Sequence, residues 1–221
     1  MQVIFNRCSW TAGDFKSVHQ EWNCDDVRRL LVLAQGLGVS QIVLTDRSIL
    51  GLDDTRTQGQ YFCARTRPEL LKAWLKDWEL SSRQLMTIRR TLRSDGDVII
   101  LSYEACDDFA GILAHKLSHH INRGLGGLSP SDLFIADFSR VTKNMRRVAR
   151  FAEYYYQNED EYYAEIWSRF LRGRKNRTLF RYLDRSLGRL RSKHAEKAQL
   201  IEEHRERAIQ VKRPNGSIFV C

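Results

Sequence analysis

The chain has 221 residues, of which 43% are hydrophobic and 29% are charged, with only three prolines. This is the composition of a globular protein with a sizeable core, and it excludes collagen-like, low-complexity and largely disordered chains. No apolar run approaches the roughly 18 residues that a membrane span needs. Arg7 follows the short apolar start without a signal-peptide pattern, so we expect neither a membrane segment nor a signal peptide.

The net charge of +9 is concentrated at one end of the chain. Residues 1–139 contain 16 Lys and Arg against 17 Asp and Glu, whereas residues 140–221 contain 20 against 10. A basic excess confined to one part of a chain points to a polyanionic partner or an anionic surface.

Five cysteines are spread along the chain: Cys8, Cys24, Cys63, Cys106 and Cys221. Their number is odd and no two form a CxxC pair, which argues against a disulfide framework. We therefore expect reduced thiols and a cytoplasmic location.

Four short apolar runs predict β-strands, at residues 3–5, 42–44, 98–101 and 133–136. Each run is continuous instead of alternating, and most are rich in β-branched residues. This pattern is typical of strands that are covered on both faces, as in a parallel sheet.

Helical patterns separate these strands, over residues 25–38, 68–79, 81–93 and 107–124. In the first of them, Asp25 and Asp26 are predicted caps, and Gly36 and Gly38 close the helix. The alternation predicts an α/β domain over residues 1–140, with a mostly parallel sheet flanked by helices. Residues 51–61 are polar and are predicted as a loop.

Beyond residue 140 the pattern is helical only, so residues 141–221 are predicted as a basic helical segment with a terminal β-hairpin. The hairpin is indicated by Asn215-Gly216 between alternating residues. A row of basic residues recurs every four positions in this segment: Arg177, Arg181, Arg185, Arg189, Lys193 and Lys197. On one continuous helix this row would form a single ridge about 30 Å long.

This ridge predicts binding to nucleic acid, either by the chain alone or as a subunit of a nucleoprotein assembly. Further basic residues are expected to assist: Arg140, Lys143, Arg146, Arg147 and Arg150. RNA or single strands are favoured slightly, because nearby tyrosines can stack on unpaired bases. These tyrosines are Tyr154, Tyr155, Tyr156, Tyr162 and Tyr163. The alternatives are a solvated helix face that the chain's own acids balance, and tyrosines that belong to the core.

An enzymatic function is the second hypothesis. Asp46, Glu104 and Asp137 follow three predicted strands, and the carboxyl ends of parallel strands meet at one edge of a sheet. Carboxylates gathered there hold Mg²⁺ in metal-dependent nucleases. The alternative is that they are ordinary turn and cap residues.

Three weaker patterns stay open. His115 and His119, with His120 beside them, have the i,i+4 spacing of a Zn²⁺ ligand pair, although Lys116 stands where zincins have a glutamate. A histidine cluster without metal is the default. Arg189 and His194 have the spacing of some RNA-cleaving helical domains. Residues 68–79 and 82–93 suit a helix-turn-helix, but ordinary crossover helices suit them as well.

Two segments resemble sulfotransferases that use an adenosine phosphosulfate donor. Residues 5–13 end in Thr11-Ala12-Gly13 after a predicted strand, like that family's phosphate loop, and residues 134–156 are similar to its later arginine segment. The resemblance implies a phosphate-handling transferase, in which Arg140 would face a cleft. Trp10 replaces the lysine with which the family grips phosphate, and this puts the phosphate grip in doubt.

Overall fold

The computed structural model describes residues 1–5, 24–45, 49–50, 56–57, 59–63, 82, 86, 88–90, 96–102, 108–125 and 159–211. These residues belong to two compact units, one ending at His120 and the other beginning at Ile121. The predicted domain boundary at residue 140 lies outside the described residues. None of the helices in the described ranges is both long enough and apolar enough to cross a membrane.

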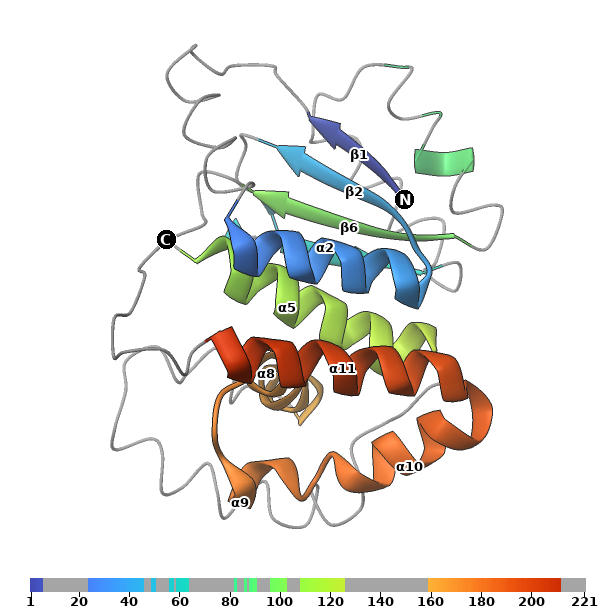
Figure 1. Cartoon of the computed structure of the whole chain (residues 1–221). Helices are drawn as coiled ribbons and strands as arrows, with labels where there is room; N and C mark the ends of the chain where they lie inside the picture. Colours follow the sequence, from blue (N-terminus) through green and yellow to red (C-terminus); the bar gives the residue numbers. More distant parts are fainter. Residues whose placement is uncertain are drawn as a thin grey trace. The chain divides into compact units, whose positions relative to one another are not determined.

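The first unit contains a four-stranded sheet in the order β1–β2–β6–β5 (Figure 1). The strands are β1 (Gln2–Phe5), β2 (Val39–Thr45), β6 (Asp97–Ser102) and β5 (Gly59–Phe62). The first three are parallel to one another, and β5 pairs antiparallel with β6. A separate antiparallel pair joins β3 (Ile49–Leu50) and β4 (Arg56–Thr57).

The three described strands that the sequence predicted are therefore confirmed, and residues 133–136 lie outside the described part. Every position of β6 is buried, which means that both of its faces are covered. This explains why its apolar run is continuous instead of alternating.

Two helices of this unit, α2 (Asp25–Leu37) and α5 (Phe109–His119), pack against each other and cover the same face of the sheet (Figure 1). A π-helical turn, His120–Gly124, continues α5 and ends at the predicted glycine. Helix α2 ends as predicted at Gly38, whose positive φ of 93° suits a residue without a Cβ.

The predicted caps of α2 are wrong in detail. Cys24 occupies the cap position without a side-chain hydrogen bond. Asp25 and Asp26 lie in the first turn, where their carboxylates interact favourably with the positive end of the helix dipole. At α5 the cap is Asp108, whose carboxylate accepts a hydrogen bond of 2.9 Å from the Gly111 backbone nitrogen.

Strand β5 was missed, because residues 51–61 were predicted as a loop. A Cβ on Gly59 would lie 3.0 Å from the Ile100 carbonyl oxygen and 3.3 Å from the Ile112 side chain. The glycine therefore lets β5 approach the sheet and α5 closely. The strand has four residues, too few for a periodic pattern to stand out.

Beyond the π-helical turn, the described part of the second unit forms the helices α8 (Glu159–Leu171), α9 (Arg177–Phe180), α10 (Asp184–Lys193) and α11 (Ala195–Val211). The single rod predicted for the basic ridge is therefore wrong. The chain leaves the helix at residues 181–183, and again at His194, where φ is −146° and ψ is 64°. Helices α10 and α11 pack against each other across this one-residue corner (Figure 1).

Burial explains the break at His194. Helix α10 buries Ser186, Leu187 and Leu190, and one straight helix would carry the later apolar residues away from that core. The reversal lets α11 bury Ala198 and Ile201 as well. Four-residue charge spacing contains no information about such a reversal, since it continues unchanged through the corner.

The core of the second unit is aromatic. Trp167 packs edge-on against Phe170 at 5.7 Å between ring centroids, and Phe170 packs in the same way against Phe180 at 5.3 Å. Helix α8 then ends at Gly173, where φ is 66°. The Gly173 nitrogen donates to the Phe170 carbonyl and the Arg174 nitrogen to the Arg169 carbonyl, which is a Schellman motif.

Several predictions concern residues outside the described part of the chain. They include the terminal hairpin and residues 68–79. Of the third predicted helix, helical conformation is described at Ser82, Met86 and residues 88–90.

Candidate functional site

Among the described residues 159–211, the excess of positive charge lies in the segment that carries α9 and α10. Residues 172–193 contain nine Arg and Lys and a single acid, Asp184. By contrast, residues 159–171 contain one Arg against four acids, and residues 194–211 contain three basic residues against four acids. We call residues 172–193 the basic segment; it contains every member of the predicted ridge except Lys197.

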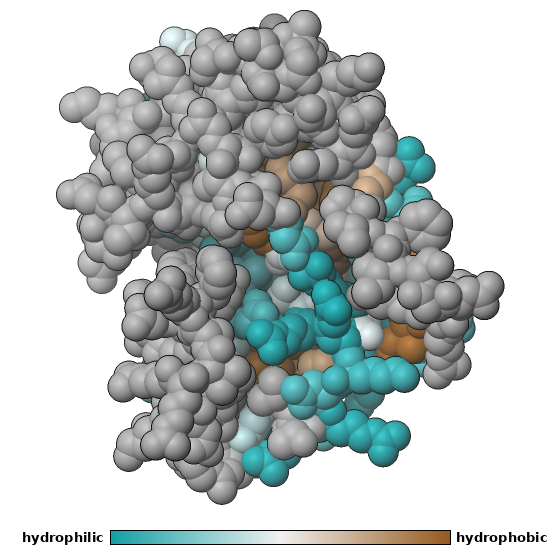
Figure 2. Space-filling view, turned by 90° about the vertical axis from the view of Figure 1, so that its left-hand side faces the viewer, coloured by the Kyte–Doolittle hydropathy of each residue, from teal (hydrophilic) through white to brown (hydrophobic). Residues whose placement is uncertain are grey.

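Most of the predicted ridge faces solvent. Five of its members are exposed: Arg177, Arg181, Arg185, Arg189 and Lys193. Lys197 is partly buried and lies on α11, beyond the corner at His194. The coloured surface in the lower part of Figure 2, at the height of the C-terminal helices, is largely hydrophilic.

The row formed by Arg185, Arg189 and Lys193 covers about 12 Å of helix α10 at 1.5 Å per residue. Its members are neighbours on one helix surface, opposite the buried Leu187 and Leu190. This helix therefore has one packed face and one basic face.

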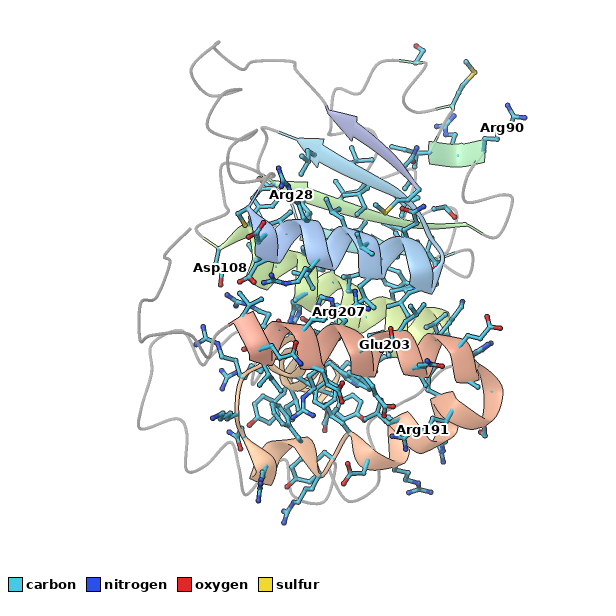
Figure 3. The ribbon with its side chains drawn as sticks, viewed as in Figure 1. Arg28, Arg90, Asp108, Arg191, Glu203 and Arg207 are labelled. Carbon is cyan, nitrogen blue, oxygen red and sulfur yellow. The ribbon has the colours of Figure 1, made fainter. Side chains whose placement is uncertain are left out.

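Ion pairs neutralise other basic residues of the unit. Arg191 reaches across from α10 to Glu202 on α11, and Arg207 pairs with Glu203 at 3.1 Å (Figure 3). Across the described ranges, no ion pair reaches Arg177, Arg189 or Lys193. Among the described acids, then, none neutralises these three charges.

Arg181 makes a different contact. Its guanidinium donates a hydrogen bond of 2.9 Å to the Tyr182 hydroxyl oxygen, and its central carbon lies 4.9 Å from the centre of the same ring. This contact leaves the positive charge in place, because the phenol is neutral. The guanidinium is held near the junction of α9 and α10.

The two described tyrosines of the predicted stacking cluster are core residues. Tyr162 and Tyr163 are buried, so neither presents a ring to a base. The Tyr163 hydroxyl donates to the Tyr182 carbonyl at 3.2 Å and shares a short hydrogen bond with Ser186. Burial raises the pKa of this hydroxyl, against the lowering effect of the Ser186 hydrogen bond and of the Arg189 charge. Tyr154, Tyr155 and Tyr156 lie outside the described residues.

The proposed carboxylates Asp46, Glu104 and Asp137 also lie outside the described residues. The ends of β2 and β6, which precede Asp46 and Glu104 in the sequence, are described. Thr45 at the end of β2 is in register with Ser102 at the end of β6, so both strands leave the sheet at the same edge.

Other predicted binding residues are likewise undescribed: Arg140, Lys143, Arg146, Arg147 and Arg150. His194, the partner of Arg189 in the RNA-cleaving spacing, forms the corner between α10 and α11. That role in the backbone accounts for its position without any catalytic function.

The predicted histidine pair is buried in the first unit. His115 and His119 are 4% and 5% exposed, and their Nε2 atoms lie 3.2 Å apart. Their rings meet edge to face, with centroids 4.9 Å apart. Since both residues project from adjacent turns of α5, the helix itself fixes their spacing.

His120 has different partners from this pair. Its Nδ1 lies 2.6 Å from an Asp97 carboxylate oxygen, and its Nε2 lies 3.1 Å from the Leu37 carbonyl oxygen. The contacts tie the end of α5 to the start of β6 and the end of α2. Sequence reasoning missed Asp97, because it lies far from His120 along the chain and no local spacing links them.

The segments that resemble sulfotransferases, residues 5–13 and 134–156, lie outside the described part except for Phe5. Comparisons with protein-family models, with curated proteins and with solved structures found no match. Function must therefore be inferred from the charges, distances and burial of the described residues.

Proposed function

We propose that the chain binds nucleic acid through the basic segment, residues 172–193. The observation that carries this proposal is the charge of the segment, with nine basic residues against one acid. Its exposed row on α10 is made by Arg185, Arg189 and Lys193. A solvated face that needs no partner is usually balanced by interspersed acids, and the basic segment contains only Asp184.

Phosphate neutralisation dominates such binding. Each Lys or Arg that neutralises a phosphate releases condensed counterions, so affinity falls steeply as salt rises. Arginines add paired hydrogen bonds to phosphate oxygens, which lysines form less readily. We expect contacts with the sugar-phosphate backbone that depend little on base sequence.

The preference for RNA or single strands stays a prediction. It now rests on Tyr154, Tyr155 and Tyr156, since Tyr162 and Tyr163 are buried. Single-stranded RNA, single-stranded DNA and duplex DNA of equal length therefore belong in the same binding experiment.

The test replaces Arg185, Arg189 and Lys193 by Gln and measures the affinity for labelled oligonucleotides from about 50 to 200 mM salt. We expect the slope of log affinity against log salt to become shallower by roughly 0.7–0.9 for each phosphate that the variant no longer neutralises. Equal affinity and an equal slope in the variant and the wild type would reject the proposal.

The matched control replaces Arg28, Arg89 and Arg90 by Gln. These three arginines are exposed in the first unit, and their removal changes the net charge by the same amount. If the control lowers the affinity as much as the α10 variant does, net charge alone governs binding and the basic segment is not the interface.

A second candidate is a Mg²⁺-dependent nuclease, or another phosphate-handling enzyme, at the edge where β2 and β6 end. The register of Thr45 with Ser102 favours it, because Asp46 and Glu104 follow these two residues closely. Asp137 is the third proposed carboxylate. We expect Mg²⁺-dependent cleavage that Asp46→Asn and Glu104→Gln each abolish. Cleavage that persists in both variants would exclude the shared site.

A further inference from the structure

We propose that His115 and His119 form a binding site for a transition-metal ion in the first unit. The site lies on α5, away from the residues of the basic segment in sequence, and it does not depend on nucleic-acid binding. The class of ligand is a divalent ion that prefers imidazole nitrogen, such as Zn²⁺, Ni²⁺ or Cu²⁺.

The distance between the ring nitrogens supports this proposal. Zinc binds histidine nitrogen at about 2.0–2.1 Å. Two nitrogens 3.2 Å apart, each at that distance from an ion, form an angle of about 100° at the ion. This angle is close to the tetrahedral value, so His115 and His119 need little movement to hold the ion.

Helix geometry supplies the preorganisation. Residues four apart on an α-helix lie one above the other on the same face, and α5 is continuous through both histidines. Neighbouring Ser118 satisfies its hydroxyl within the helix, by donating to the Ala114 carbonyl at 2.7 Å. One continuous helix therefore sets the spacing of the two rings.

A direct hydrogen bond is the competing explanation for the contact between the rings. At 3.2 Å one Nε2 can donate to the other, which requires that only one of them carries the proton. A metal ion needs the lone pair of both Nε2 atoms, so the donating ring must move its Nε2 proton to Nδ1, the other neutral tautomer. The two explanations therefore predict opposite responses to added metal.

The pair is proposed as a binding site and not as a hydrolytic centre. Zincins place a glutamate directly after the first histidine as the general base, and here that position is occupied by Lys116, which is buried. A lysine side chain is a poor substitute for that general base. The two imidazoles supply two coordination positions, and water or other oxygen ligands would supply the rest.

The experiment adds Cu²⁺ to the wild-type chain and records the electron paramagnetic resonance spectrum. We expect one bound ion per chain, with hyperfine splitting from two nitrogen ligands. A spectrum of free Cu²⁺, or one with a single nitrogen ligand, would overturn the proposal. This measurement needs no substitution, so it does not depend on whether a variant folds.

Substitution then assigns the ligands. His115→Gln and His119→Gln keep a polar side chain of similar size, and circular dichroism checks that each variant is folded. We expect each to weaken Zn²⁺ binding at least tenfold in calorimetry, whereas His194→Gln, a control outside the pair, leaves it unchanged. Wild-type affinity in either folded ligand variant would overturn the assignment.

Discussion

Two glycines of the second unit predict opposite responses to the same change. Gly173 has a φ of 66°, and a Cβ added there would lie 2.9 Å from the Ala208 carbonyl carbon of α11. Gly188 lies within α10, and a Cβ there would meet nothing within 4 Å. Alanine should therefore destabilise the fold at the first position and stabilise it at the second.

The magnitudes follow from the two surroundings. At Gly173 the left-handed backbone costs an alanine about 1–2 kcal/mol. Overlap with backbone atoms, which no rotamer change relieves, adds about 1–3 kcal/mol. At Gly188 a regular helix gains about 0.5–1 kcal/mol when alanine replaces glycine.

Urea unfolding followed by circular dichroism at 222 nm measures both changes, and an unchanged slope with denaturant shows that the same surface unfolds. We expect a lower midpoint for Gly173→Ala and a higher one for Gly188→Ala. A neutral Gly173→Ala would refute the close approach of α11 to the end of α8. A destabilising Gly188→Ala would show that this face of α10 is not open.

Burial raises the pKa of the Tyr163 hydroxyl above its ordinary value of 10.0, so its stabilising contribution is complete below about pH 10 and is lost as the pH rises through the folded-state pKa. Tyr163→Phe should lower the free energy of unfolding by about 1–2 kcal/mol near neutral pH, because Ser186 loses its partner. In urea unfolding, the difference between the variant and the wild type should shrink above pH 10. A difference that stays constant with pH would contradict the burial of the hydroxyl. Arg205 lies 4.2 Å from the centre of the Phe170 ring, so Arg205→Met should cost about 0.5–2 kcal/mol. The control Arg207→Met breaks only an exposed ion pair and should lower the free energy of unfolding by less than about 1 kcal/mol. Equal losses in the two variants would show that the contact of Arg205 with the Phe170 ring adds no stability.

The sheet could be predicted because burial leaves a local pattern in the sequence. Residues 98–101 form a continuous apolar run, and such runs arise where both faces of a strand are covered. The end of α2 could be predicted for a similar reason, because Gly38 adopts a backbone conformation that favours glycine. These signals depend on neighbours along the chain.

What was missed depends on contacts between distant residues. The basic row continues through His194 at constant spacing, while the helix carrying it ends there because α11 must return to the core. The contact of His120 with Asp97 joins residues that share no motif. Of the candidate sites, the histidine pair could be predicted from its spacing, because both residues lie on one helix. The burial of the pair could not be predicted from that spacing.

The uneven distribution of acids and bases among the C-terminal helices affects how a partner arrives. Residues 172–193 are strongly positive, whereas residues 159–171 carry three more acids than bases and residues 194–211 carry one more. Such an arrangement has an electric dipole, whose field orients an approaching polyanion before any side chain touches it. At about 0.15 M salt this guidance extends only about 8 Å, so the rate of association should depend on ionic strength even where the final contacts are unchanged.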